Sequence, residues 1–278
     1  MEEKGVSKLE KGREKFLYSA YTKHRKKFDK IIRFMKQNNR YAKKYRENYL
    51  NSIINGQDSF KEKIRKLFVH DINAAGGNNL SSTGTSCKKF YKIIDKFPNE
   101  KKIKLTSFFN KLGSGSEDFD GIFKFLVKKK KFKNFNKKKV ALFIRNIHII
   151  NKKLFIDYSI RKRKNELKIP VDVVIVSTLN NILCLKGKNK LKPTRDSDFI
   201  LINKFAKDKL KNDYMLIEDL WFWGYFNSKT IKSKTKKGKT KKDKRKFIFN
   251  EDKYYSNPHT YPNKELRSKL IKFKKLLN

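Results

Sequence analysis

The sequence predicts an all-α protein, and three observations carry this prediction. Apolar residues recur three or four positions apart along most of the chain, as on one face of a helix. No stretch alternates apolar and polar residues for long enough to propose a sheet. Only five prolines and twelve glycines interrupt the 278 residues. With 37% hydrophobic and 13% aromatic residues, the chain can bury the core of one large domain or of two small ones.

The apolar spacing places the helices one by one. Residues 73–86, rich in Gly, Asn, Ser and Thr, are expected to form a loop, and residues 112–117 mark a second break. The expected helices are 16–35, 41–53, 60–68, 87–97, 105–112, 119–128, 137–147, 171–182, 199–210, 214–225 and 266–277.

Composition divides the chain into four segments. A basic helical segment, 1–55, precedes a helical core at 56–226. Residues 227–246 are rich in Lys and nearly free of apolar side chains, so we expect a disordered, flexible arm. Residues 247–278 form a C-terminal segment that ends in a helix.

The charge balance points to a polyanionic partner. The chain has 72 Lys and Arg against 27 Asp and Glu, a net charge of +45, and this self-repulsion opposes compact folding unless an anion offsets it. Nucleic acid is the first candidate. The charge is spread along the whole chain and no lipidation signal or long apolar run is present, so no membrane role is expected. Without a signal peptide, we expect an intracellular protein of the cytoplasm or nucleoid.

Metal and cofactor chemistry is not indicated. Cys87 and Cys184 are the only cysteines, which is too few for a disulfide framework. The four histidines have no spacing that suggests a metal site. We therefore predict no metal and no cofactor.

The most informative stretch is 137–175. Val140, Phe143 and Ile147 give one apolar helix face, with Lys139 in the first turn of that helix. Pro170 and Asp172 mark the start of a later helix, where free backbone amides favour a carboxylate. A lysine and an aspartate at two helix starts are thereby expected to face one cleft.

These residues resemble a known family. The Lys139-Val140-Ala141 step, the Pro-Val-Asp that ends at Asp172, and the Leu-Trp-Phe-Trp-Gly at 220–224 occur in the order seen in the helix-hairpin-helix (HhH-GPD) DNA glycosylases. The likeness covers roughly 119–225, and it extends to the 8-oxoguanine glycosylase/AP lyase type. It implies a two-lobed helical fold, with the basic arm added, acting as a monomer on double-stranded DNA. Two cysteines exclude the four-cysteine iron–sulfur cluster of some members.

The resemblance also implies an activity and a site. A damaged or modified base would flip into a cleft between the lobes and be excised in base-excision repair. Lys139 would attack the sugar and form a Schiff base that can lead to strand cleavage, while Asp172 would stabilise the cationic sugar or activate the nucleophile. Where the family has Gly-x-Gly this chain has Phe135-Asn136-Lys137. The implied DNA contacts are Asn136, Lys137, Lys138 and Arg145, and the implied base-pocket residues are Trp221 and Trp223.

Other interpretations stay open. Asp172 is also an ordinary helix cap by its position, and either tryptophan is also a core residue by its size. If Lys139 only contacts phosphate, Asp172 with a water still gives a monofunctional glycosylase. A protein that binds DNA or RNA without catalysis is the alternative from another class. A nuclease using Asp157, Glu166 and Lys168 is the third.

Overall fold

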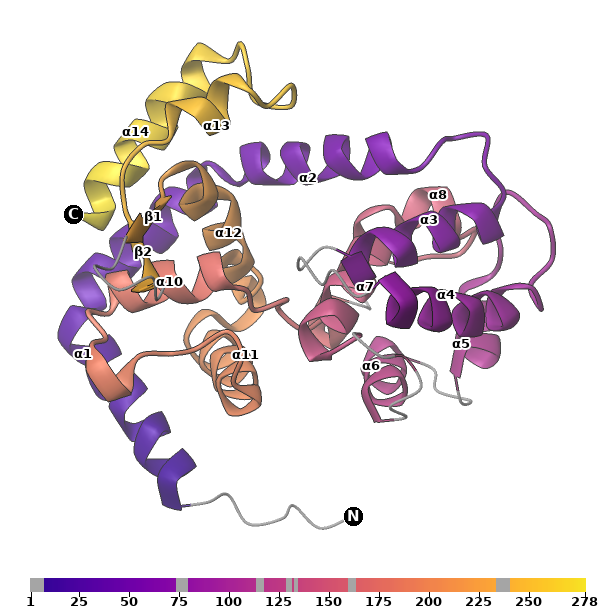
Figure 1. Cartoon of the computed structure of the whole chain (residues 1–278), viewed down its shortest axis with the longest axis horizontal. Coiled ribbons are helices and arrows are strands. Elements are labelled where there is room, and N and C mark those ends of the chain that lie inside the picture. The colour runs from indigo at the N-terminus through magenta and orange to yellow at the C-terminus, as the bar shows by residue number, and fades with distance from the viewer. Residues whose placement is uncertain are drawn as a thin grey trace. The chain divides into compact units, whose positions relative to one another are not determined.

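The computed structural model (Figure 1) describes residues 8–73, 80–113, 118–128, 132, 135–159, 164–233 and 241–278. These residues are mostly helical, which confirms the all-α prediction at that level. The chain divides into two compact units. Unit 1 combines Met1–Tyr45 with Val171–Asn278, and unit 2 is Arg46–Pro170.

This division differs from the four segments expected from composition. The first boundary lies inside a helix at Tyr45 and the second follows Pro170, whereas the sequence suggested boundaries at 55, 226 and 246. The two ends of the chain share a unit because the first helix packs against four helices of the C-terminal part.

Unit 1 is built from helices and one hairpin. Its elements are α1 (Lys8–Gln37), the first part of α2 (Asn39–Ile53), α10 (Val173–Ile182), α11 (Asp196–Leu210), α12 (Leu216–Phe226), β1 (Lys229–Ser233), β2 (Lys241–Lys246), α13 (Glu251–Tyr255) and α14 (Lys264–Leu277). Short 3-10 turns occupy Gly187–Asn189 and Lys211–Asp213.

The core of unit 1 is aromatic. Trp223 of α12 is fully buried between Phe34 of α1, with ring centroids 5.1 Å apart, and Phe273 of α14, at 5.5 Å. Phe205 of α11 packs edge-on against Phe28 of α1. Burying such large rings is the main source of stability for helices this rich in lysine.

Gly224 fixes the approach of α12 to α10. A methyl group at Gly224 would overlap the side chains of Thr178 and Val174 on α10. The glycine of the Leu-Trp-Phe-Trp-Gly segment is thus required by packing, because no larger residue fits between the two helices at this distance.

The Lys-rich segment expected to be disordered instead contains paired strands. β1 and β2 are antiparallel, with Lys229 opposite Lys246 and Thr230 opposite Arg245, and the register is irregular between Ile231 and Ser233. Residues 234–240 lie outside the described residues. Pairing occurs because backbone hydrogen bonds need no apolar side chains, and because the following residues anchor the hairpin: the Asn250 amide donates to the Phe226 carbonyl at 2.8 Å.

Unit 2 is helical apart from one isolated parallel bridge between Ile103 and Phe155 among its described residues. Besides the end of α2, its elements are α3 (Phe60–Asn73), α4 (Leu80–Ile94), α5 (Leu105–Gly113), α6 (Phe119–Lys128), α7 (Lys137–Ile149), α8 (Asn151–Leu154) and a 3-10 turn, Lys164–Glu166. Phe68 of α3 stacks on Phe90 of α4 at 3.7 Å, and Phe143 of α7 packs edge-on against Phe68. This cluster holds α3, α4 and α7 together.

The loop expected at 73–86 is shorter than the composition suggests. α4 begins at Leu80, and residues 74–79 lie outside the described residues. Phe90 and Ile94 are fully buried on one face of α4. Packing of that face overrides the weak helix preference of Ser and Thr, which is less than about 1 kcal/mol per residue.

No helix among the described ranges combines the length and the apolar character needed to cross a bilayer.

Candidate functional site

The segment that leads into α7 is anchored by phenylalanines. Phe132 and Phe135 are buried, and the Phe135 amide donates to the Phe132 carbonyl at 3.2 Å. Phe135 also packs against Phe68, with ring centroids 4.8 Å apart. α6 and α7 pack against each other on either side of this segment. The burial of Phe132 and Phe135 therefore positions the start of α7. In the glycosylase family that the sequence resembles, glycines occupy this turn.

Asn136 caps α7. Its side-chain oxygen accepts a hydrogen bond from the Lys139 amide at 3.1 Å, which satisfies one of the free amides of the first turn. The residue expected to contact DNA is thus an N-cap, and it is exposed at the end of the helix.

Lys139 is buried, with 4% of its surface exposed. Its Nζ donates to the Ile72 carbonyl at the end of α3. No carboxylate pairs with Lys139 among the described residues. Burial lowers the pKa of its ammonium, and the neighbouring charge of Lys138 lowers it further. A larger fraction of this side chain is therefore an unprotonated amine near neutral pH than in an ordinary lysine.

The first turn of α7 is positively charged. Lys137, Lys138 and Lys139 occupy it, with no acidic residue, although the N-terminal end of a helix already carries partial positive charge. This arrangement is unfavourable by itself and favourable next to an anion such as phosphate.

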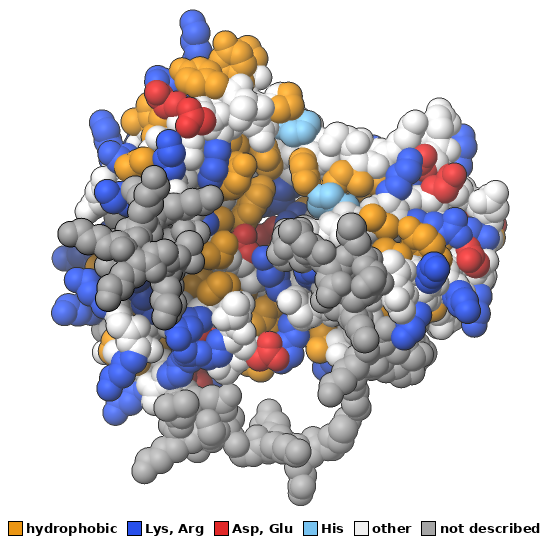
Figure 2. All heavy atoms as spheres, viewed as in Figure 1, with side chains coloured by type: hydrophobic (Ala, Val, Ile, Leu, Met, Phe, Trp, Pro, Cys, Tyr) orange, Lys and Arg blue, Asp and Glu red, His pale blue; other side chains and the backbone are white. Residues whose placement is uncertain are grey.

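In the space-filling view, Lys and Arg side chains are spread over the visible face with few acidic side chains among them (Figure 2).

A buried acid lies beside the contact made by Lys139, and sequence analysis missed it. Asp71 of α3 is fully buried, and its Oδ1 accepts a hydrogen bond from Asn146 Nδ2 at 2.8 Å. Nδ1 of His70 lies 2.8 Å from the same oxygen, and Nε2 of His70 lies 2.9 Å from Oη of Tyr49. Burial raises the pKa of Asp71, and the contacts with His70 and Asn146, together with the charge of Arg145, partly oppose this rise. Arg145, expected to contact DNA, is half-buried near Asp71.

A signal for Asp71 was present in the sequence. Phe60, Ile64, Leu67 and Phe68 form the apolar stripe of α3, and position 71 continues it. A carboxylate on the buried face of a helix is costly unless it is hydrogen-bonded. An aspartate at this position therefore indicates a structural or functional role.

Asp172 is the N-cap of α10. Its Oδ1 accepts a hydrogen bond from the Ile175 amide at 2.8 Å, and the residue is half-buried. The ordinary capping interpretation of this residue is confirmed. Asp172 also interacts electrostatically with Arg245 of β2. Burial lowers the pKa of Arg245, and the negative charge of Asp172 opposes that shift.

The hairpin base beside Asp172 holds a second lysine with a low pKa. Lys253 Nζ donates to the carbonyls of Tyr225 at 3.0 Å and Ser228 at 3.2 Å, and lies 4.1 Å from the centre of the Tyr225 ring. Burial lowers the pKa of Lys253 to about 8, with a smaller contribution from the charge of Arg245. Arg245 donates to Oγ of Ser228 at 3.0 Å.

A groove of about 930 Å³ lies on the surface of unit 1, and its lining includes Val173, the residue after Asp172. It runs between α10 and the hairpin, and among the described residues its lining has cations but no acid. The charged and polar residues lining it are Ser177, Asn180, Asn181, Lys186, Lys190, Thr230 and Arg245. This groove has the chemistry to hold an anionic ligand.

The two tryptophans have different environments. Trp223 is a core residue with no exposed surface, so it cannot line a base pocket in this conformation. Trp221 is half-buried and stacks on Tyr225, with ring centroids 5.4 Å apart and planes 17° apart. Only Trp221 remains a candidate for contact with a base.

The residues considered for a nuclease have structural roles. Asp157 accepts a hydrogen bond from the Leu105 amide, and Glu166 accepts one from the Phe119 amide. Lys168 pairs with Asp120 at 2.7 Å. No group of three or more metal-binding side chains occurs within the described ranges.

Lys139 and Asp172 belong to different units, unit 2 and unit 1 respectively. Comparisons with protein-family models, with curated proteins and with solved structures found no match to this chain.

Proposed function

We propose that this protein is a DNA N-glycosylase with an associated AP lyase activity, acting in base-excision repair. The observation that carries the proposal is Lys139: a buried lysine, held at the start of α7 by a backbone carbonyl, whose pKa is lowered. An amine of this kind is what nucleophilic attack on a sugar carbon requires, because only the unprotonated form carries a free electron pair.

The surroundings of Lys139 support a DNA phosphate as neighbour. Lys137 and Lys138 share its helical turn, where the helix dipole and the lysines together attract an anion. A phosphate there would bring the nucleotide to be processed close to the amine. It would also offset part of the +45 net charge.

Asp172 has the second role in the proposal. Attack on the anomeric carbon passes through a cationic sugar, and a carboxylate stabilises that charge. One oxygen of Asp172 caps α10, which fixes the orientation of the carboxylate. We propose that the negative charge of this oriented group acts on the sugar.

A panel of duplexes, each carrying one damaged or modified base, tests the activity. Release of a free base from at least one duplex, dependent on the protein, is expected. Protein whose Lys139 and Asp172 are both replaced, as Lys139→Gln with Asp172→Asn, is the control for contaminating enzymes. If wild-type protein and the double variant release the same amount from every duplex, the proposal is wrong.

Nucleic-acid binding without catalysis is the second candidate. The observation that favours it is the capping hydrogen bond of Asp172, which already explains why an aspartate stands there. This alternative predicts tight, salt-dependent DNA binding with no base release and no covalent adduct.

A further inference from the structure

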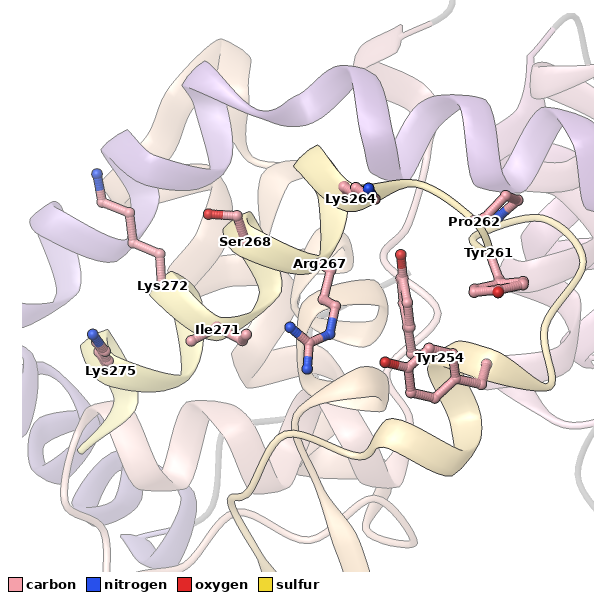
Figure 3. A pocket seen from close by; sticks show the side chains of 10 residues that line it. Tyr254, Tyr261, Pro262, Lys264, Arg267, Ser268, Ile271, Lys272 and Lys275 are labelled. Atoms are coloured by element: carbon pink, nitrogen blue, oxygen red, sulfur yellow. The ribbon is translucent and has the colours of Figure 1, made fainter.

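A pocket of about 1000 Å³ lies on unit 1 between α13 and α14 (Figure 3). Residues 247–278, which include both helices, are described without a gap, and no acidic residue lines the pocket. One end of it is formed by tyrosines and the length of it by α14.

Two of the three tyrosines are half-exposed. Tyr254 is buried, and its hydroxyl donates to the Asn263 carbonyl at 2.6 Å, which anchors the group. Tyr255 and Tyr261 are each 50% exposed, with ring centroids 5.4 Å apart and planes 67° apart. Two large exposed rings side by side are unusual on a free surface and typical of a binding surface.

α14 supplies a basic stripe along the pocket. Lys264, Ser268, Ile271 and Lys275 share one helix face, since they are spaced four, three and four residues apart. Lys272 stands beside them. The opposite face, which includes Leu270 and Phe273, is buried in the core, so the stripe points away from the core.

The acids of this region are already paired. Glu251 pairs with Arg267 at 2.9 Å, and Glu265 pairs with Arg40 at 2.8 Å. Lys264, Lys272 and Lys275 form no ion pair among the described residues. The positive charge of these three lysines is therefore available to bind a ligand.

We propose that this pocket binds unpaired nucleotides of a DNA strand, with bases stacked on Tyr255 and Tyr261 and phosphates held by the lysines of α14. The combination of exposed aromatic rings and a row of cations is the chemistry of single-strand binding, where rings take bases and cations follow the backbone. A paired duplex keeps its base faces covered by neighbouring bases and offers the pocket only phosphate.

The proposal concerns binding alone and does not depend on base excision. Absence of base release would remove the proposed function and leave this inference standing. Loss of strand binding at the pocket would remove this inference and leave the glycosylase proposal standing.

The test uses the full chain and a thymidine strand containing one 2-aminopurine, whose fluorescence is quenched when it stacks. Tyr255→Leu and Tyr261→Leu each remove a ring from a half-exposed position, so folding is retained and is checked by thermal melting. Tyr255→Phe keeps the ring. Phe16→Leu, which removes a 39% exposed ring from α1, is the matched control.

Quenching by wild-type protein is expected, and Tyr255→Leu and Tyr261→Leu should each weaken strand binding by about fivefold or more, the lower end for losing one base stack. Tyr255→Phe and Phe16→Leu should stay within about twofold of wild type. Strand binding and quenching unchanged in both leucine variants would overturn the proposal.

Two further arms identify the ligand. The same strand paired with its complement should bind with an affinity that Tyr255→Leu leaves unchanged. Equal weakening for duplex would mean that the pocket does not select unpaired bases, which contradicts the proposal. Free thymidine monophosphate should compete far less well than the strand at equal nucleotide concentration. Equal competition would assign the pocket to free nucleotides instead of a strand.

Discussion

The surroundings of Lys139 and of Asp172 differ in how far structure alone explains each residue. Asp172 caps α10 and lies within the electrostatic reach of Arg245, so its carboxylate has a structural purpose. Lys139 is buried beside other lysines, and one backbone carbonyl is its partner in the described part of the chain. Burying an ammonium without a carboxylate destabilises a fold.

This difference identifies Lys139 as the residue on which the proposed function mainly depends. A helix start needs a cap but does not need a buried lysine, since methionine fills similar space without the desolvation penalty. Residues that lower stability without structural return are typical of functional sites. The account of base excision therefore depends on Lys139 first and on Asp172 second.

Lys139→Gln should have the largest effect, a complete loss of the covalent adduct that borohydride traps between protein and DNA, because this variant lacks the amine proposed as the nucleophile. Lys63→Gln is the matched control. Lys63 is also buried in unit 2, its Nζ donates to the carbonyls of Lys101 and Lys153, and burial lowers its pKa. An adduct that survives Lys139→Gln and disappears in Lys63→Gln would reverse the comparison.

Asp172→Asn should reduce base release by about 100-fold, the scale for losing one group that stabilises developing charge. The amide oxygen of asparagine still caps α10, so the melting temperature should change little. Rates are measured in single turnover on a duplex that wild type processes. Full activity in this variant would show that Asp172 is a cap only.

Gly224→Ala should lower the free energy of unfolding by about 1–3 kcal/mol, because the added methyl overlaps Thr178 and Val174 on the helix that Asp172 caps. Gly12→Ala in α1 is the control, since a methyl there meets no atom within 4 Å. It should be neutral or stabilising by up to about 1 kcal/mol. Denaturant unfolding of both variants measures the two changes in stability. Equal stability of Gly224→Ala and Gly12→Ala would show that α10 and α12 are not closely packed at Gly224.

Lys253→Met should have the smallest effect, and it should depend on pH. The folded-state pKa of about 8 lies below the ordinary value of 10.5, so the unfolded chain binds more protons between these values. Wild-type stability gains from this group as pH rises from about 8 to about 10. The advantage of the methionine variant should shrink over the same range in thermal melts. A difference between variant and wild type that does not change with pH would mean that Lys253 has an ordinary pKa.

Sequence patterns predicted the helices well and the tertiary roles less well. Periodic apolar spacing located α6 at 119–128 and the start of α10 within two residues, because helix burial depends on local spacing. The β1–β2 hairpin was missed because its strands have few apolar residues, and pairing is a backbone property. Asp71 was missed because its partners, His70 apart, come from α7, far along the chain.

The candidate residues show the same limit. The capping role of Asp172 followed from its position after Pro170. The packing role of Gly224 depends on where α10 lies against α12. The contact of Lys139 with Ile72 was not predictable, because it depends on where α3 lies against α7. Local signals identify helix ends, whereas burial of a charge is decided by distant segments.

Borohydride trapping followed by mapping of the modified residue is the most direct test of the central claim. Wild-type protein is incubated with duplexes that carry an abasic site or different damaged bases, reduced, digested and analysed by mass spectrometry. The account predicts a sugar adduct on Lys139. An adduct on Lys137, Lys138, Lys63 or Lys253 in its place, or no adduct with any of the duplexes, would contradict the assignment of Lys139 as the nucleophile.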